Sequence, residues 1–197
     1  MYEILTQVIG FAGMGICISS FACKRSNGIV LLQAVGNALF IVHFLMLGAY
    51  SGCFNIAIVV FSNLILLLCM QGKQWASWIG WRWIFSLFSV IVCTITWRNL
   101  YSLLPCISTI VLILTAWTRR ATVIRLGKIT VVGPGWILYN LYVRSWSGVF
   151  SESFGILSAL FSLAYYRWNG QMSHLDISNE DLLATKRKRR TGQKSPD

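Results

Sequence analysis

The sequence has few charged residues, and only six of them are acidic. Only 12% of its 197 residues are Asp, Glu, Lys or Arg, whereas soluble domains carry about 25%. No charged residue occurs from Gln33 to Gln71 or from Trp83 to Trp97, and Glu152 is the only acid between Glu3 and Asp176. A soluble domain of this size could not bury all of these uncharged stretches, so the composition excludes an ordinary water-soluble domain.

The sequence also lacks the short motifs of common enzymes and metal sites. It has no HExxH, no GxSxG and no glycine-rich phosphate loop, and its two histidines are His43 and His174. Its six cysteines include no CxxC pair, so we expect them to pack as small apolar residues. The first 21 residues have no basic leader and no obvious cleavage site, which predicts a retained helix. We therefore expect no enzyme activity, no metal and no cofactor.

Seven apolar segments come close to the roughly 20 helical residues that cross a bilayer. They are continuous and do not alternate with polar residues, which favours helices over a membrane β-barrel. The sequence therefore predicts an all-α membrane protein with seven transmembrane helices. The expected spans are Ile4–Phe21, Ile29–Leu47, Cys53–Met70, Trp81–Trp97, Leu100–Trp117, Ile129–Val143 and Val149–Tyr166.

The basic residues predict the orientation of these spans. With seven crossings, 15 of the 17 Lys and Arg residues lie on one side and only Arg98 and Arg144 on the other. The positive-inside rule then places the N-terminus outside and the C-terminus in the cytoplasm. Six spans would put the basic tail and the Arg119–Lys128 segment on opposite sides.

The polar composition from Asn169 onward predicts a disordered cytoplasmic tail. Its KRKRR run resembles a nucleic-acid patch, but in a membrane protein we expect it to attract anionic lipid headgroups and predict no nucleic-acid partner. The run consists of Lys186, Arg187, Lys188, Arg189 and Arg190.

An internal repeat emerges when the sequence is shifted by 96 positions. Phe40 then aligns with Trp136, and Ser51–Gly52 aligns with Ser147–Gly148. Helix lengths and loop charges repeat in the same register. This predicts two like-oriented three-helix repeats joined by a linker helix, the plan of SWEET-type transporters. The expected units are 1–71 (first repeat), 72–99 (interfacial segment and linker helix), 100–168 (second repeat) and 169–197 (tail).

A further resemblance lies in His43, Phe44, Leu47, Gly48 and Tyr50, in Leu103, Leu104, Pro105, Ser108 and Thr109, and in Asn140, Ser145 and Glu152. With these residues, and over about residues 7–168, the sequence resembles the YgjV-like family of bacterial inner-membrane proteins. This resemblance implies an inner-membrane location and the same architecture, but no substrate. Two features depart from the related patterns: Val59 and Ser62 stand where the family can carry Asn and Arg, and Pro134 has no neighbouring Gln, as the proline-glutamine motif of the wider transporter superfamily would require.

Glu152 is the first candidate for a functional residue, because ionisable groups within spans are costly and often functional. It could bind a solute, a cation or a proton. It could equally stabilise the N-terminal end of its helix and pair with Arg144 across the hairpin. The sequence leaves both alternatives open.

Uncharged polar residues within the spans form the second group of candidates. His43 could take part in a binding site or make one hydrogen bond between helices, as could the asparagines. Two asparagines that reach one cavity would suit a sugar or an amide. The asparagines are Asn37, Asn55, Asn63 and Asn140.

From these features we predict a SWEET-like transporter of a small polar solute in a bacterial inner membrane. The alternative is a receptor or adaptor that binds a ligand without transporting it or recruits a partner through its basic tail. Self-association into a homo-oligomer is compatible with either.

Overall fold

The structure is a computed structural model and describes residues 2–19 and 26–169. All regular elements in these two ranges are helical, which confirms the predicted all-α class. The basic run and the rest of the tail predicted after Asn169 lie outside the described residues. The helices are α1 (Tyr2–Ser19), α2 (Ser26–Met46), α3 (Tyr50–Met70), η2 (Gln74–Ser77), α4 (Gly80–Ile95), η3 (Leu100–Ser102), α5 (Leu103–Trp117), α6 (Ala121–Gly127), η4 (Lys128–Val132), α7 (Gly133–Tyr142) and α8 (Trp146–Trp168).

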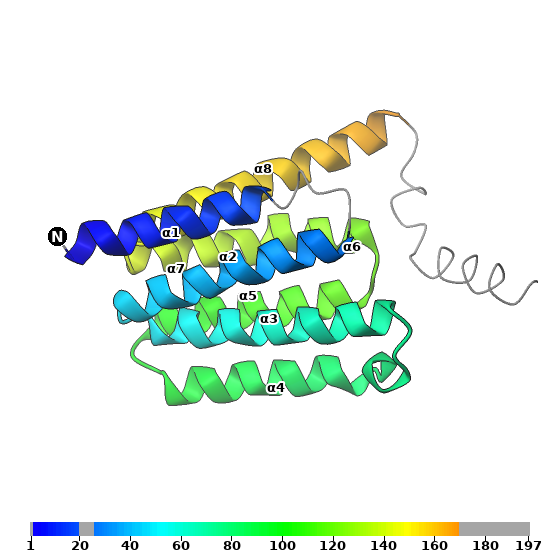
Figure 1. Ribbon diagram of the computed structural model, residues 1–197, viewed down its shortest axis with the longest axis horizontal. Coiled ribbons are helices and arrows are strands. Elements are labelled where there is room, and N and C mark those ends of the chain that lie inside the picture. Colours follow the sequence, from blue (N-terminus) through cyan, green and yellow to red (C-terminus); the bar gives the residue numbers. More distant parts are fainter. Residues whose placement is uncertain (1, 20–25, 170–197) are drawn as a thin grey trace, which may run out of the picture.

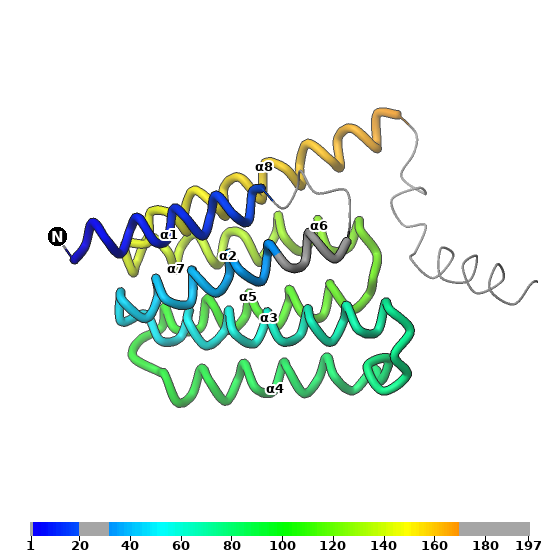
Figure 2. The backbone as a smooth tube through the Cα atoms, viewed as in Figure 1, coloured from blue at the N-terminus to red at the C-terminus, as the bar shows by residue number. Residues whose placement is uncertain are grey.

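The long helices lie side by side and successive ones run in opposite directions, so their connections gather at two ends of the bundle (Figure 1). We call one of them the hairpin end. It holds the start of α1, the turns 47–49 and 143–145, and the connection 96–99. The opposite end holds η2 and the connection between α5 and α6, as the chain path in Figure 2 shows.

Five helical segments are long and apolar enough to cross a membrane, and two shorter apolar helices, Leu32–Met46 and Gly80–Ile95, lie beside them. Large apolar side chains remain exposed around the bundle; Ile95 is 77% and Phe161 75% exposed. Soluble proteins rarely expose apolar surface on this scale, whereas lipid covers it in a membrane. The five segments are Tyr2–Ser19, Tyr50–Met70, Leu100–Trp117, Ala121–Tyr142 and Trp146–Trp168.

The sixth predicted span, Ile129–Val143, was too short at its start. The elements α6, η4 and α7 form one helical segment of 22 residues, Ala121–Tyr142. The prediction stopped at Lys128 because a charge usually ends an apolar span, but this lysine has an acidic partner on α8. A paired charge on a long side chain is tolerated within a helix bundle.

The helix widens into a π-helical turn, η4, just before Pro134. Gly133 donates its N–H to the carbonyl of Lys128, five residues earlier. Proline has no amide hydrogen, and its ring collides with the carbonyl four residues earlier in a regular α-helix. The wider turn accommodates Pro134 without breaking the helix.

The two turns at the hairpin end share one hydrogen-bond pattern. Ala49 N donates to Phe44 O at 2.9 Å, and Ser145 N donates to Asn140 O at 2.8 Å. The residue before each donor has a left-handed backbone, with φ +66° at Gly48 and φ +58° at Arg144. Both turns are therefore Schellman-type helix ends, and corresponding residues are 96 positions apart, as in the sequence register.

Candidate functional site

A cavity of about 340 Å³ lies at the hairpin end. It is lined by both Schellman turns and by the connection between α4 and α5, so segments from both halves of the chain build it. Its charged residues are Arg98 and Arg144, and no acidic side chain lines it. The lining comprises Leu47, Gly48, Ala49, Tyr50, Ser51, Thr96, Arg98, Asn99, Ser102, Tyr139, Tyr142, Val143 and Arg144.

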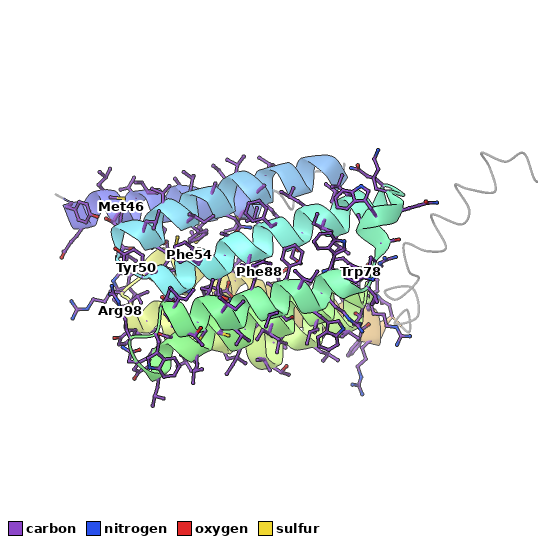
Figure 3. The ribbon with its side chains drawn as sticks, turned by 90° about the horizontal axis from the view of Figure 1, so that it is seen from below. Met46, Tyr50, Phe54, Trp78, Phe88 and Arg98 are labelled. Carbon is purple, nitrogen blue, oxygen red and sulfur yellow. The ribbon has the colours of Figure 1, made fainter. Side chains whose placement is uncertain are left out.

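Side chains tie the α4–α5 connection to the turn before α3. Ser51 Oγ and Thr96 Oγ1 share a hydrogen bond of 2.7 Å. Arg98 Nη1 donates to the carbonyl of Gly48 at 3.3 Å, and its guanidinium lies 5.1 Å from the ring centre of Tyr50. Figure 3 shows Arg98 and Tyr50 together at this end of the bundle, far from Trp78.

The same connection contacts the end of α7, just before the turn that leads into α8. Asn99 Nδ2 donates to Tyr142 Oη. The rings of Tyr101 and Tyr142 stack with 4.2 Å between their centres. The cavity walls are thus held by specific contacts on both sides.

A second cavity, of about 220 Å³, lies between α2 and α3. Three amide side chains line it, from Gln33, Asn37 and Asn63, and the rest of the lining is mainly aliphatic. Two of the predicted asparagines therefore reach one cavity. Every lining residue belongs to the first half of the chain.

A buried aromatic cluster lies between the two cavities in the order of residues along α2. Its rings lie at similar spacings, with 6.2 Å between the centres of Phe44 and Trp136 and 6.0 Å between those of Trp136 and Tyr139. Along α2 the amides of the second cavity come first, the cluster next, and the hairpin-end cavity last. The cluster, which we call the aromatic plug, consists of Phe40, Phe44, Trp136 and Tyr139.

An ion pair joins the helical segment 121–142 to α8. Lys128 Nζ lies 2.5 Å from Glu152 Oε2, and both side chains are about one-fifth to one-quarter exposed (24% and 20%). Gly155 leaves room for the lysine, since a Cβ atom there would lie 2.9 Å from Lys128 Cε. At about 1.5 Å per residue, each partner lies about 10 Å inside its helical segment, so the pair is well inside two segments that are long and apolar enough to cross a membrane.

The predicted pair between Arg144 and Glu152 is wrong. Arg144 lies in the turn, where its carbonyl accepts a hydrogen bond of 2.8 Å from Gln7 Nε2. Glu152 lies eight residues further along, on the part of α8 that meets Lys128. Nearness along the chain was a poor guide, because α8 carries Glu152 about 12 Å away from the turn.

His43 is fully buried between α1, α2 and the start of α8. Its Nδ1 lies 2.7 Å from the carbonyl oxygen of Thr6, and its Nε2 lies 2.8 Å from Ser145 Oγ. A carbonyl only accepts hydrogen bonds, so Nδ1 carries the proton; in the neutral ring the Ser145 hydroxyl then donates to Nε2. Ser145 Oγ also accepts from Gly148 N at 3.3 Å, which caps α8. Through these bonds His43 connects α2 to α1 and to the start of α8.

The other two asparagines are also buried in helix contacts. Asn55 Nδ2 donates to Ser51 O at 2.8 Å, and Asn55 Oδ1 accepts from Ser89 Oγ at 2.6 Å. Asn140 packs against Gly148, where a Cβ atom would collide with its amide. Its Oδ1 has no hydrogen-bond partner among the described residues.

The predicted residues therefore do not converge on one site. Asn37 and Asn63 share a cavity, Glu152 binds Lys128, Arg144 lines the hairpin-end cavity, and His43 and Asn55 connect helices. Sequence reasoning missed Lys128 and Arg98. Both had a usable signal, since Lys128 directly precedes the sixth predicted span and Arg98 was one of two basic residues assigned to the outside.

Comparison with known proteins supplies the family. No curated protein and no solved structure matches the chain. The Imp-YgjV family, described as bacterial inner membrane protein, matches residues 4–171. This match covers every described helix except the first two residues of α1. The chain is a membrane protein that belongs to the Imp-YgjV family of bacterial inner membrane proteins.

Proposed function

We propose that this protein transports a small polar solute across the inner membrane. The observation that carries the proposal is the pair of cavities on either side of the aromatic plug. A transporter needs a site that opens to one side at a time, and a buried aromatic cluster between two cavities suits a state in which the path between them is closed.

The proposed topology has seven crossings, with the hairpin end outside. The two shorter apolar helices, Leu32–Met46 and Gly80–Ile95, complete the crossings begun by the five longer segments. The hairpin end then carries Arg98 and Arg144, and the basic residues of the opposite end face the cytoplasm, in agreement with the positive-inside rule.

The proposed repeats comprise α1–α3 and the α5–α8 region, with α4 as the linker. Two observations support them. The Schellman turns correspond in the 96-residue register. In addition, α3 packs on α5 and α8 packs on α1. In the proposed repeats α1 corresponds to α5 and α3 corresponds to α8, so exchanging the repeats turns one of these contacts into the other. A two-fold axis along the membrane normal would relate such like-oriented repeats.

The amides of the α2–α3 cavity suit a solute that makes several hydrogen bonds. Gln33, Asn37 and Asn63 each offer both a donor and an acceptor and carry no charge. The aliphatic lining beside them would contact the apolar part of the solute, as is usual in small-molecule sites.

Flux into proteoliposomes tests the proposal. We expect uptake of at least one member of a panel of sugars, amino acids and organic acids. Asn37→Leu and Asn63→Leu should each reduce this uptake at least tenfold while expression stays normal. Gln71→Leu is the matched control, because it removes an exposed amide just beyond α3 and should leave uptake unchanged.

Binding without flux would favour the alternative, a receptor or adaptor. That result would keep the cavities as ligand sites and overturn transport. Unchanged uptake in both asparagine variants would show instead that the α2–α3 cavity is not on the solute path.

A further inference from the structure

We propose that the hairpin-end cavity binds an oxyanion, such as a phosphate or carboxylate group, through Arg98 and Arg144. The binding itself does not depend on transport. Only the idea that the anion belongs to a transported solute rests on the proposed function.

The local charge favours an anion. Two arginines and no acid line the cavity. Among the described residues the acids are Glu3 and Glu152; neither lines the cavity, and Glu152 is already bound to Lys128. The positive charge of the cavity therefore has no counter-charge from its own lining.

Arg98 is held in place but not neutralised. Its contacts are a carbonyl oxygen, Gly48 O, and the face of the Tyr50 ring. Both partners are uncharged and together occupy only part of the guanidinium, which has five N–H donors. The remaining donors can meet the oxygens of a phosphate or carboxylate, for which arginine has a matching planar geometry.

Arg144 occupies a backbone position that is costly for arginine. Its φ is +58°, in the left-handed region where Schellman turns usually place glycine or asparagine. The first turn has glycine at the corresponding position, Gly48, with φ +66°. Strained backbone of this kind often accompanies function, and here it occurs at an arginine that lines the cavity.

Hydroxyl and amide groups complete the site. Tyr139, Tyr142 and Ser102 line the cavity together with Asn99, and such groups can donate further hydrogen bonds to an anion. Tyr139 also belongs to the aromatic plug. The volume of about 340 Å³ is of the size that small-molecule sites have.

The test measures thermal stability of the full-length protein in nanodiscs of zwitterionic lipid, with inorganic phosphate or acetate added at constant ionic strength. A ligand that binds only the folded state raises the Tm in a saturable way. We expect a saturable rise for the wild type with at least one of the two anions. A second arm replaces part of the lipid by phosphatidylglycerol, which distinguishes a lipid phosphate from a free anion.

Arg144→Gly is the decisive variant, because glycine relieves the strained backbone and the protein should still fold. Without the anion its Tm should be equal to or higher than that of the wild type. Its affinity for the anion should fall about tenfold or more, as expected for the loss of a charge-assisted hydrogen bond. Arg98→Gln should weaken binding similarly.

Arg119→Gly is the matched control. Arg119 is also an arginine with positive φ, +57°, but it lies at the opposite end of the bundle, with Nη2 3.0 Å from Cys69 Sγ. This variant should bind the anion as the wild type does. The proposal would be overturned if Arg144→Gly and the wild type showed the same rise in Tm, or if neither the free anions nor the anionic lipid raised the Tm. A rise in Tm with phosphatidylglycerol that requires Arg144 would support the proposal, with a lipid headgroup as the ligand.

Discussion

Lys128 Nζ lies 2.5 Å from Glu152 Oε2, and the two residues belong to neighbouring helical segments, well inside their ends. Each charge makes the other tolerable in a medium that solvates ions poorly. The lysine begins the π-helical turn before Pro134, and turns of this kind are frequent at functional sites. Lys128 is therefore both a partner in the ion pair and the first residue of an irregular stretch of helix.

The ion pair predicts a specific pattern of stabilities. Glu152→Gln leaves the lysine charge without a partner and should lower the free energy of unfolding by about 2–3 kcal/mol, the approximate cost of a lone charge within a span. Lys128→Met alone should be similarly harmful. The double variant should recover most of the loss, because no lone charge remains. Thermal unfolding of the four proteins in detergent measures the coupling.

The same cycle with Arg144 serves as the control. Arg144→Gln and Glu152→Gln should show no coupling, because the structure places Arg144 in the turn and not beside Glu152. Coupling in this second cycle and none in the first would contradict the observed pairing.

Ser145 both hydrogen-bonds His43 and caps α8, so removing its hydroxyl group should destabilise the protein. Ser145→Ala removes a helix cap, worth about 1 kcal/mol, and leaves His43 Nε2 buried without its main partner, which costs about 1–3 kcal/mol more. Ser147→Ala should cost clearly less, because Ser147 Oγ lies 3.5 Å from the same nitrogen and does not cap the helix. Equal losses of Tm in the two variants would argue against the role given to Ser145.

Two glycines on α1 predict opposite outcomes. A Cβ atom at Gly10 would collide with Ser147 Oγ and lie 2.8 Å from His43 Nδ1, so Gly10→Ala should destabilise the protein by about 1–3 kcal/mol. A Cβ atom at Gly15 would meet nothing within 4 Å. Gly15→Ala should therefore be neutral or stabilising, because alanine favours helix by about 1 kcal/mol. Expression yield and Tm measure both, and a harmful Gly15→Ala would contradict the packing of α1.

The proposed topology predicts the behaviour of fused reporters. A reporter that is active only outside the cytoplasm should be active at the N-terminus and silent on the tail, and a reporter that fluoresces only in the cytoplasm should show the reverse. Activity of the first reporter on the tail would rule out seven crossings with the N-terminus outside.

The sequence predicted the class of fold well because lipid imposes a simple rule. Long uncharged runs must become helices, and the tight turns 47–49 and 143–145 lie where two of the predicted spans end, at Leu47 and Val143. The prediction failed at Lys128, where a contact with α8 allows a charge inside a helical segment.

The site was harder to predict, because side-chain pairing between helices depends on their rotation and on which helices are neighbours. Asn37 and Asn63 reach one cavity. Asn55 has the same chemistry, but its side-chain amide makes hydrogen bonds with Ser51 and Ser89 instead. Nothing in the sequence separates these asparagines. Their different roles follow from which face of its helix each one occupies.

The bond between Asn55 and Ser89 also bears on the order of assembly during membrane insertion. Asn55 Nδ2 is satisfied within α3, but its Oδ1 takes its partner from α4. When α3 leaves the translocation machinery, this oxygen enters lipid with no donor from its own helix, which is unfavourable. The donor arrives 34 residues later in synthesis. We therefore expect α3 and α4 to pack together before the second half of the chain is inserted. The α4 helix is then already in position when α5 packs against it.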